Sequence, residues 1–262
     1  MSEPNPYQPP VTPAPPASAS ASAGAFSAEG RAVDAGRGWE WIAEGFALFK
    51  KQPGIWILIL IVLVVCSILI SLVPIIGALA NLLLMQVFIG GVMLGCRALD
   101  NGESFDVWCV FAGFKQNTGD LVVLGLLALV GWILAFIPAM LIMGGGAFMA
   151  MMGGGGFMPN IGALGLTFAL AILVALALAL PVYMALWFAP SLVVFNDLKP
   201  VDAMRASFLA CLKNIVPFVL YGIILLGLCM VAAIPLGLGF LVLGPVAIAS
   251  IYAGYRDIFV VG

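Results

Sequence analysis

The side chains that could carry chemistry are few and scattered along the chain. Histidine is absent from the 262 residues, so a zinc protease of the His-Glu-x-x-His type is excluded. No pair of the five cysteines has the Cys-x-x-Cys spacing of a redox or metal site, and such thiols ordinarily serve as small packing residues. Asp100, Glu103 and Asp106 lie close together, but in a polar stretch typical of a solvated loop. We therefore expect no enzyme activity, no metal and no cofactor.

Two polar residues interrupt a long apolar stretch and are candidates for a binding site. Asn81 and Gln86 are five residues apart, so on a helix they point in somewhat different directions. They could offer hydrogen bonds to an uncharged solute. The alternative is that they bond neighbouring helices, which is the commoner role of such residues in membranes.

A glycine- and methionine-rich segment, residues 144–160, is the other unusual stretch. Together with Met140 and Met143, which come just before it, the segment places six of the twelve methionines within 19 residues. Thioethers are soft ligands that suit Cu(I). A loop that lies against the membrane explains the same composition, because methionine adapts to irregular apolar surfaces. We favour the loop.

The composition identifies the class of protein. Of the residues, 64% are hydrophobic and 8% are charged, against roughly a quarter charged in a soluble domain. This excludes a soluble enzyme, a nucleic-acid binder and a disulfide-linked secreted domain. Three long stretches carry no charge, namely 52–96, 121–196 and 214–255. Ion-coupled transporters and pumps place ionisable groups in their spans, so these classes are disfavoured as well.

Each charge-free stretch is long enough for two membrane helices, since one crossing needs about 20 residues. The fold class predicted is an all-α, polytopic bundle of six spans. The spans lie near 54–73, 75–96, 121–143, 162–190, 215–234 and 236–255. All charged residues then share one side, which the positive-inside rule assigns to the cytoplasm together with both termini. The run 161–195 is too long for one straight span and must leave the core or bend at Pro181.

An internal repeat underlies the three stretches. A short amphipathic segment ends in a lysine before each one, and a proline follows that lysine at a nearly constant distance. The distances are 23 residues from Lys51 to Pro74, 23 from Lys115 to Pro138 and 22 from Lys213 to Pro235. Each distance corresponds to about 34 Å of helix, which is one membrane crossing. The unit predicted is a short helix, a span, a proline turn and a second span, repeated three times.

The short segments are predicted to be helices in the headgroup plane, where lysine reaches anionic phosphates. Their apolar faces carry Trp41, Ile42, Phe46 and Phe49 in the first, Phe105, Trp108 and Phe111 in the second, and Val201, Met204, Phe208 and Cys211 or Leu212 in the third. The residues predicted to contact lipid are Trp41, Lys50, Lys51, Trp108, Lys115, Arg205 and Lys213. The alternative is that each segment only extends its span into the cytoplasm.

The chain divides into two parts. Residues 1–38 are rich in Pro, Ala and Ser and hold too few apolar residues to fold, so they are predicted to be a disordered cytoplasmic tail. The tail lacks the pattern of a secretory signal peptide. Residues 39–262 form the six-helix transmembrane domain.

Two stretches carry a family resemblance. The sequences 38–56 (GWEWIAEGFALFKKQPGIW) and 187–207 (WFAPSLVVFNDLKPVDAMRAS), together with 102–105 and 113–117, are similar to a family of uncharacterised six-helix inner-membrane proteins of Gram-negative bacteria. The arrangement more distantly resembles the membrane domain attached to some glycerophosphodiester phosphodiesterases, whose soluble catalytic domain this chain lacks. The resemblance covers about residues 38–256 and implies an inner-membrane location without an activity.

The function expected is that of a non-enzymatic inner-membrane protein that engages lipid or a membrane partner through its short helices. The alternative is a facilitator for an uncharged or amphiphilic solute, with a cavity near Asn81 and Gln86. Partners expected are membrane lipids, a second copy of the chain or another envelope protein, and no nucleic acid. Gly91 and Gly95 form a GxxxG pair that serves either dimerisation or packing within the bundle.

Overall fold

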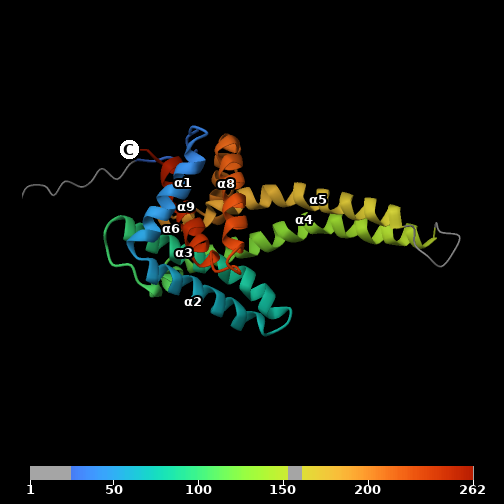
Figure 1. Cartoon of the computed structure of the whole chain (residues 1–262), viewed down its shortest axis with the longest axis horizontal. Helices are drawn as coiled ribbons and strands as arrows, with labels where there is room; N and C mark the ends of the chain where they lie inside the picture. The colour runs from blue at the N-terminus through green and yellow to red at the C-terminus, as the bar shows by residue number, and fades with distance from the viewer. Residues whose placement is uncertain (1–24, 153–160, 262) are drawn as a thin grey trace, which may run out of the picture.

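The computed structural model describes residues 25–152 and 161–261, and nearly all of them are helical (Figure 1). The helices are α1 (Arg37–Lys51), α2 (Pro53–Ser71), α3 (Ile76–Asp100), the 3-10 helix η1 (Val107–Phe114), α4 (Thr118–Met152), α5 (Ile161–Trp187), α6 (Ala189–Asn196), α7 (Pro200–Lys213), α8 (Ile215–Ala233) and α9 (Phe240–Phe259). Two short strands, β1 (Ala25–Phe26) and β2 (Val260–Val261), pair antiparallel. The predicted helical class is thus confirmed.

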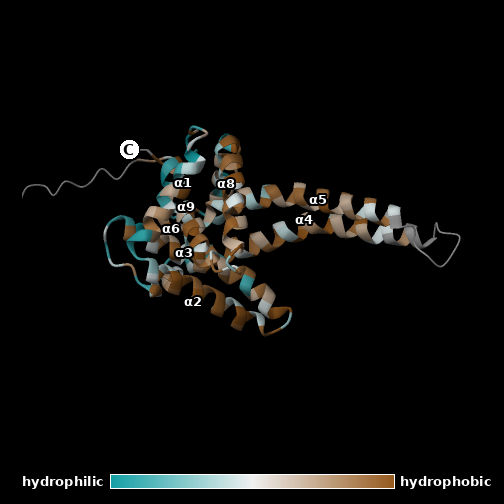
Figure 2. Cartoon of the chain, in the orientation of Figure 1, coloured by the Kyte–Doolittle hydropathy of each residue, from teal (hydrophilic) through white to brown (hydrophobic). Residues whose placement is uncertain are grey.

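Three helical hairpins dominate the shape. They are α2–α3, α4–α5 and α8–α9, and each follows a short helix, which is α1, η1 or α7 respectively. The α4–α5 hairpin extends away from the rest of the chain along the long axis of the molecule (Figure 1). The hairpins are apolar along their length, whereas the hydrophilic colour gathers around α1 and the loop after α3 (Figure 2). The molecule therefore has one polar end and several apolar arms.

Five helical segments are long and apolar enough to cross a membrane. They are Pro53–Ser71, Ile76–Asp100, Thr118–Gly146, Leu164–Asn196 and Ile215–Ala233. Most of their apolar surface is exposed to the surroundings, as lipid-facing helices require. The predicted sixth span, 236–255, corresponds to α9, which is not among the five. This helix ends in the charged pair Arg256 and Asp257 and is covered by α1, α2 and α8 along much of its length, so it needs a less apolar surface.

The long fourth run breaks at Phe188 and not at Pro181, which lies inside α5. The hydroxyl of Ser207 on α7 causes the break. Its Oγ accepts a bond from the Phe188 N–H at 3.0 Å and donates to the Met184 carbonyl at 2.7 Å. The side chain thus occupies the place of a regular backbone bond between those two groups. Pro190, which has no N–H to donate, then lies at the start of α6.

The prediction of a disordered tail over residues 1–38 is wrong for residues 25–38. These residues are docked onto the end of α9 and the start of α8. The backbone N–H groups of Ser27 and Arg31 donate to the carbonyls of Phe259 and Ile258 at 2.9 Å each. Asn214 bonds the same segment on both sides, since it accepts from the Val33 N–H and donates to the Arg31 carbonyl. These long-range bonds replace the apolar core that the composition lacks. The remainder of the predicted tail, residues 1–24, lies outside the described residues.

Close glycine contacts seat α1 against α8 and α9. A Cβ at Gly38 would lie 2.3 Å from the Pro217 carbonyl oxygen, and one at Gly45 would lie 2.7 Å from the Val246 carbonyl oxygen. Only glycine permits backbones to approach so closely. The core of the protein forms around this contact, with Trp41 and Phe259 among its largest buried side chains.

Candidate functional site

The last turn of α9 carries a polar group with three side-chain donors, the carboxylate of Asp257. Its Oδ1 accepts a bond from Arg31 at 2.6 Å. Its Oδ2 accepts bonds from Arg37 at 2.6 Å and from Trp41 Nε1 at 2.9 Å. The N-terminal segment, α1 and α9 are thus joined at a single side chain, which is itself buried.

The charge of this carboxylate is stabilised by its donors. Burial disfavours the ionised form, but the hydrogen bonds from Arg37, Trp41 and Arg31 outweigh it and hold the pKa of Asp257 below its usual value. The same bond to Asp257 raises the pKa of Arg37. Arg37 also pairs with Glu40 and Glu44 on α1. The two shifts favour the ionised form of both Asp257 and Arg37.

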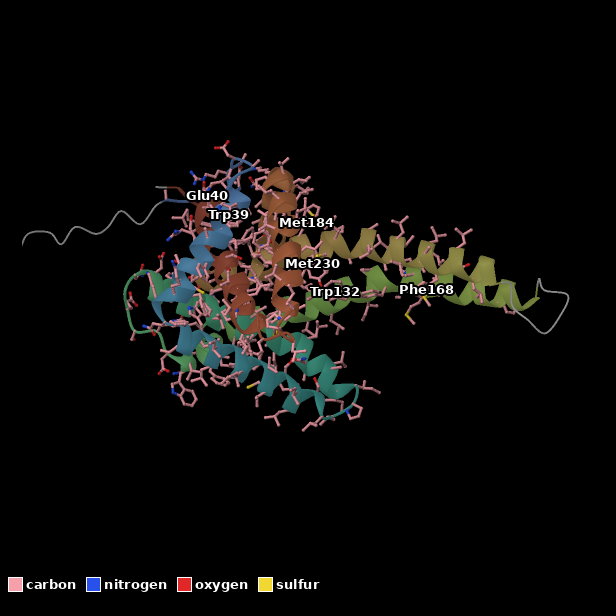
Figure 3. All side chains as sticks on the ribbon, in the orientation of Figure 1. Trp39, Glu40, Trp132, Phe168, Met184 and Met230 are labelled. Atoms are coloured by element: carbon pink, nitrogen blue, oxygen red, sulfur yellow. The ribbon has the colours of Figure 1, made fainter. Side chains whose placement is uncertain are left out.

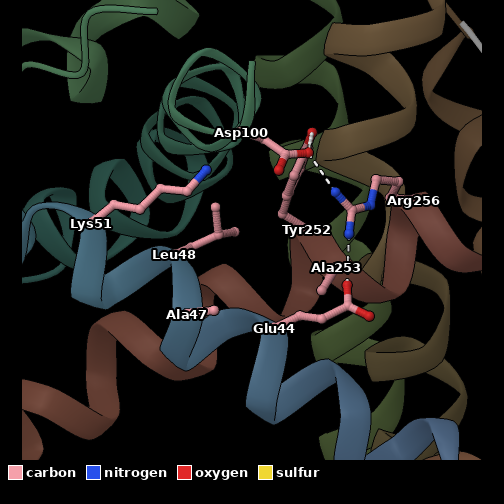
Figure 4. Close-up of a pocket in the computed structure, with 8 residues that line it drawn as sticks. All are labelled: Glu44, Ala47, Leu48, Lys51, Asp100, Tyr252, Ala253 and Arg256. Carbon is pink, nitrogen blue, oxygen red and sulfur yellow. Dashed lines mark hydrogen bonds and ion pairs between the residues drawn. The ribbon is translucent and has the colours of Figure 1, made fainter. Parts of the chain in front are cut away.

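A second cluster surrounds the neighbouring residue, Arg256, as Figure 4 shows. Its guanidinium lies 2.8 Å from Glu44 on α1 and 2.5 Å from Asp100 at the end of α3. The Tyr252 hydroxyl donates to the same Asp100 carboxylate at 3.2 Å. Lys51 points toward this region and donates to the Leu99 carbonyl at 3.1 Å. Arg256 therefore joins α9 to both α1 and α3.

A small cavity of about 120 Å³ lies within this second cluster, lined by Glu44, Lys51, Asp100, Tyr252 and Arg256 among others. The cavity would hold water or a small polar group. Its charges balance, and the carboxylates are already paired with the arginine. Among residues 25–152 and 161–261, no group of three or more Cys, Asp or Glu side chains could hold a metal ion. The arrangement suits a structural junction better than a reaction centre.

The second hairpin joins the same polar end through α6. The Tyr255 hydroxyl on α9 donates to Asn196 at 2.6 Å. Asn117, just before α4, donates to the adjacent Asp197 at 2.8 Å. Asp197 adopts a left-handed backbone conformation that ends α6. Side chains on α9 and its neighbours thus connect the polar ends of all three hairpins.

The predicted lipid-contacting residues separate into buried and exposed ones. Trp41 is only 2% exposed and bonds Asp257, so its predicted contact with lipid is wrong. Ile42 and Phe49 are buried as well, because α8 and α9 cover the face of α1 that was expected to meet the membrane. Phe46 alone remains exposed on that face, with the Lys50 ammonium 5.1 Å from its ring centre. Lys50 and Lys51 are both exposed.

The second short helix presents the clearest surface. Phe105 is buried against the core, but Trp108 is 70% exposed, and the Lys115 side chain beyond the helix is exposed too. The indole therefore lies outside the packed body of the protein. Exposed tryptophan side chains are enriched at membrane–water interfaces.

The third short helix turns its small residues inward. Ala203, Ser207 and Ala210 of α7 are buried, whereas Val201 and Leu212 of the predicted apolar stripe are exposed. Arg205 is exposed, and the Lys213 ammonium donates to the Glu29 and Gly30 carbonyls at 2.9 and 3.3 Å. Burial raises the pKa of the Cys211 thiol, on the inner face, to about 12, so this cysteine is an unreactive packing residue.

Comparison with known proteins gives one relative that decides the family. The chain is 32% identical over 250 residues to a probable inner membrane protein of Burkholderia thailandensis, and the alignment covers 87% of this chain and 92% of that protein. This chain belongs to the same family of inner-membrane proteins. No family model matches the sequence. No solved structure matches it either.

Family membership supports the predicted resemblance and location at the level of an inner-membrane protein with several apolar helices. The relative is described by its location alone, so the family supplies no activity. The comparison does not show the more distant resemblance to phosphodiesterase membrane domains.

One of the two polar residues predicted within the membrane, Asn81, packs one helix against another. Asn81 on α3 accepts a hydrogen bond from Ser67 on α2 at 2.9 Å, which joins the two helices of one hairpin. Gln86 is buried on α3. The bond of Asn81 is of the kind that the helix-packing alternative predicts. The predicted loop at 144–160 is wrong for its first part, because helix α4 continues to Met152. Its second part, residues 153–160, lies outside the described residues.

The GxxxG pair packs within the chain. A Cβ at Gly91 would lie 2.5 Å from the Cys109 carbonyl oxygen, and one at Gly95 would lie 2.7 Å from the Cys109 Sγ. Both glycines therefore seat η1 on α3, as the packing alternative predicted. Burial raises the pKa of the Cys109 thiol to about 12, in keeping with a packing role at this contact.

Proposed function

We propose that this protein is a non-enzymatic, six-span inner-membrane protein with both termini in the cytoplasm. In this proposal its three short helices engage anionic lipid at the cytoplasmic surface. The observation that carries the lipid contact is the exposure of Trp108 on η1 and of Lys115 just after it, an aromatic side chain and a cation that both lie outside the packed body.

The pairing of β1 with β2 supports the even number of spans. Residues 25–26 bond residues 260–261, so both must lie on the same side of the membrane. A chain that begins and ends on one side crosses an even number of times. The five apolar segments need one more crossing to satisfy this condition, and α9 is the helix that returns. The order of a short helix followed by a hairpin, found three times, supports the proposed repeat.

Charge placement supports the orientation. The lysines and arginines of the described chain gather at the polar end, which the positive-inside rule assigns to the cytoplasm. Lys50 and Lys115 are the best placed to reach lipid. Lys51 and Lys213 are less available because each already donates to a backbone carbonyl.

The test is binding of phosphatidylglycerol to the detergent-solubilised full chain, measured by native mass spectrometry and by the shift in melting temperature at low salt. We expect Lys50→Gln/Lys115→Gln to lower the apparent affinity about tenfold or more, since each basic residue near an anionic surface contributes about 1 kcal/mol. The matched control, Lys50→Arg/Lys115→Arg, retains both charges and should bind as the wild type does. Equal binding by the Gln and Arg variants would refute the proposal.

A further inference from the structure

An apolar groove of about 470 Å³ opens between α5, α7 and α8. Four of its twelve lining residues are aromatic, namely Tyr183 and Trp187 from α5 and Phe218 and Tyr221 from α8. Trp187 meets both rings of α8 edge-on at 5.7 and 5.8 Å between ring centres. Met184, labelled in Figure 3, lines the groove from the α5 side. The rings are fixed by one another, so the groove is formed in the absence of any occupant.

The length of the groove matches one leaflet of a bilayer. Its α8 wall runs from Ile215, at the start of the helix, to Leu225. Ten residues of helix span about 15 Å, which is half of a hydrocarbon core of about 30 Å. Its volume lies within the usual range of small-molecule sites, about 300–1,000 Å³. A helix about 10 Å in diameter needs about 1,200 Å³ over the same length, so a partner helix does not fit.

A hollow of mixed charge adjoins the groove along α7. Its volume is about 410 Å³, and Glu29, Asp202, Arg205 and Lys213 line it together with Leu209. Leu209 and Lys213 line this hollow, and Leu212, which lies between them in sequence, lines the groove, so the two hollows are neighbours along α7. Arg205 is one turn before Leu209 on the same face.

The charges of the hollow can still meet a ligand, although Lys213 has only one of its three N–H donors left after its bonds to two carbonyls. Within the described residues no ion pair joins Glu29, Asp202, Arg205 or Lys213 to any opposite charge, and the Lys213 ammonium is held by carbonyl groups. Two carboxylates and two cations therefore face the same space. A ligand that complements them carries both a negative and a positive group.

We propose that this site binds one phospholipid with a zwitterionic, primary-amine headgroup, that is, a phosphoethanolamine lipid of the cytoplasmic leaflet. Its phosphate pairs with Arg205 and Lys213, its ammonium pairs with Glu29 and Asp202, and an acyl chain fills the groove between α5 and α8. An anionic lipid would leave both carboxylates opposite a negative headgroup. A choline headgroup would offer them a cation without N–H donors. This inference rests on the proposed function, because it requires α7 to lie at the membrane surface.

The test substitutes two glycines of α8, Gly222 and Gly227, only one of which lines the groove. A Cβ at Gly222 or Gly227 would meet no atom within 4 Å, so both positions accept a larger side chain. Gly222 lines the groove and Gly227 does not. In native mass spectrometry of the full chain with phosphatidylethanolamine, we expect one retained lipid per protein. Gly222→Phe should lower its occupancy at least about tenfold, and Gly227→Phe should leave it unchanged.

The headgroup is tested separately. The double variant Glu29→Gln/Asp202→Asn should lose about three- to tenfold in affinity for phosphatidylethanolamine, as expected for two exposed ion pairs, and should gain in affinity for phosphatidylglycerol. Equal retention of ethanolamine, choline and glycerol lipids by the wild type would overturn the inference. Equal loss in the two Phe variants, or a dimer mass in place of a lipid adduct, would overturn it too.

Failure of this inference can be told apart from failure of the proposed function. The Lys50/Lys115 variants change neither hollow, so their binding of phosphatidylglycerol reports on the short helices alone. If those variants lose binding while the groove variants show no effect, only the lipid site is wrong. If neither set shows an effect, the proposed function itself fails.

Discussion

The Nε1 atom of Trp41 lies 2.9 Å from the Oδ2 atom of Asp257, although 216 residues separate the two in sequence. The bond joins the first helix of the described chain to the last. Arg31 and Arg37 bond the same carboxylate, and the short strands β1 and β2 pair directly beside it. The segment from Arg31 to Trp41 and the last turn of α9 are thus held together by charge-assisted bonds and a buried indole.

Replacing the central carboxylate should weaken this junction. Asp257→Asn leaves Arg31 and Arg37 without their shared counter-charge and leaves a single acceptor oxygen for three donors, the buried Trp41 N–H among them. We expect a loss of about 2–3 kcal/mol, below the roughly 3–5 kcal/mol of a fully buried pair, because both arginines are partly exposed. Thermal unfolding in mild detergent, followed by circular dichroism, measures the loss. Glu103→Gln, which changes an exposed carboxylate, should leave the melting temperature within error of the wild type.

The same carboxylate predicts a direction of pH dependence. Because the pKa of Asp257 is lower in the folded state, the unfolded chain takes up this proton first as the pH falls. The stabilisation is therefore present above the unfolded pKa, about 3.9, and is lost progressively below it. Melting curves of the wild type and Asp257→Asn between pH 6 and pH 3 should converge as the pH falls. A difference that stays constant over this range would show that ionisation of Asp257 does not contribute.

The hairpins could be predicted from the sequence, because uninterrupted apolar stretches of this length have few other structures available to them. The break in the fourth run could not. Pro181 is the residue that local rules select, but the structure breaks where the Ser207 hydroxyl from another helix replaces a backbone bond. Local sequence does not show which side chain from elsewhere will reach a given turn.

The polar junction was missed for a similar reason. Arg31 and Asp257 are 226 residues apart, and only the folded chain brings them to 2.6 Å. A signal was nevertheless present, because a chain with so few charges places Arg256 and Asp257 directly after an apolar stretch. The amphipathic pattern of α1 was recognised correctly as such, but the pattern does not distinguish a face that meets lipid from one that α8 and α9 cover.

Adding a methyl group at Gly45 should destabilise the protein, whereas the same change at Gly54 should not. Gly45→Ala would place a Cβ 2.7 Å from the Val246 carbonyl oxygen and 2.8 Å from the Ser250 nitrogen, both of them rigid backbone atoms. We expect a loss of about 1–3 kcal/mol from overpacking at the contact between α1 and α9. Gly54→Ala, near the start of α2, meets no atom within 4 Å and should be neutral or stabilising by up to about 1 kcal/mol. Comparable melting temperatures for the two variants would contradict this contact.

The topology can be tested at the turn between α8 and α9. Leu236 is 98% exposed there, and Glu103 is exposed at the polar end. If α9 is the sixth span, Leu236→Cys should react with a membrane-impermeant maleimide in spheroplasts, whereas Glu103→Cys should react only after the membrane is opened. The labelling is read against the unsubstituted chain, in which Cys96 and Cys211 are buried, Cys109 has a raised pKa, and the partly exposed Cys66 and Cys229 lie within the apolar helices α2 and α8.

Labelling at these two positions and at a cysteine added after Gly262 distinguishes six spans from the alternative topologies. If α8 did not cross the membrane, Leu236→Cys would be protected in spheroplasts together with Glu103→Cys. If α9 did not return, a cysteine added after Gly262 would be labelled from outside, and the β1–β2 pair could not exist, because its strands would be separated by the bilayer. Protection of that C-terminal cysteine together with labelling of Leu236→Cys is the result that six spans require. This result is expected because the hydrogen-bonded strands β1 and β2 cannot lie on opposite sides of a membrane.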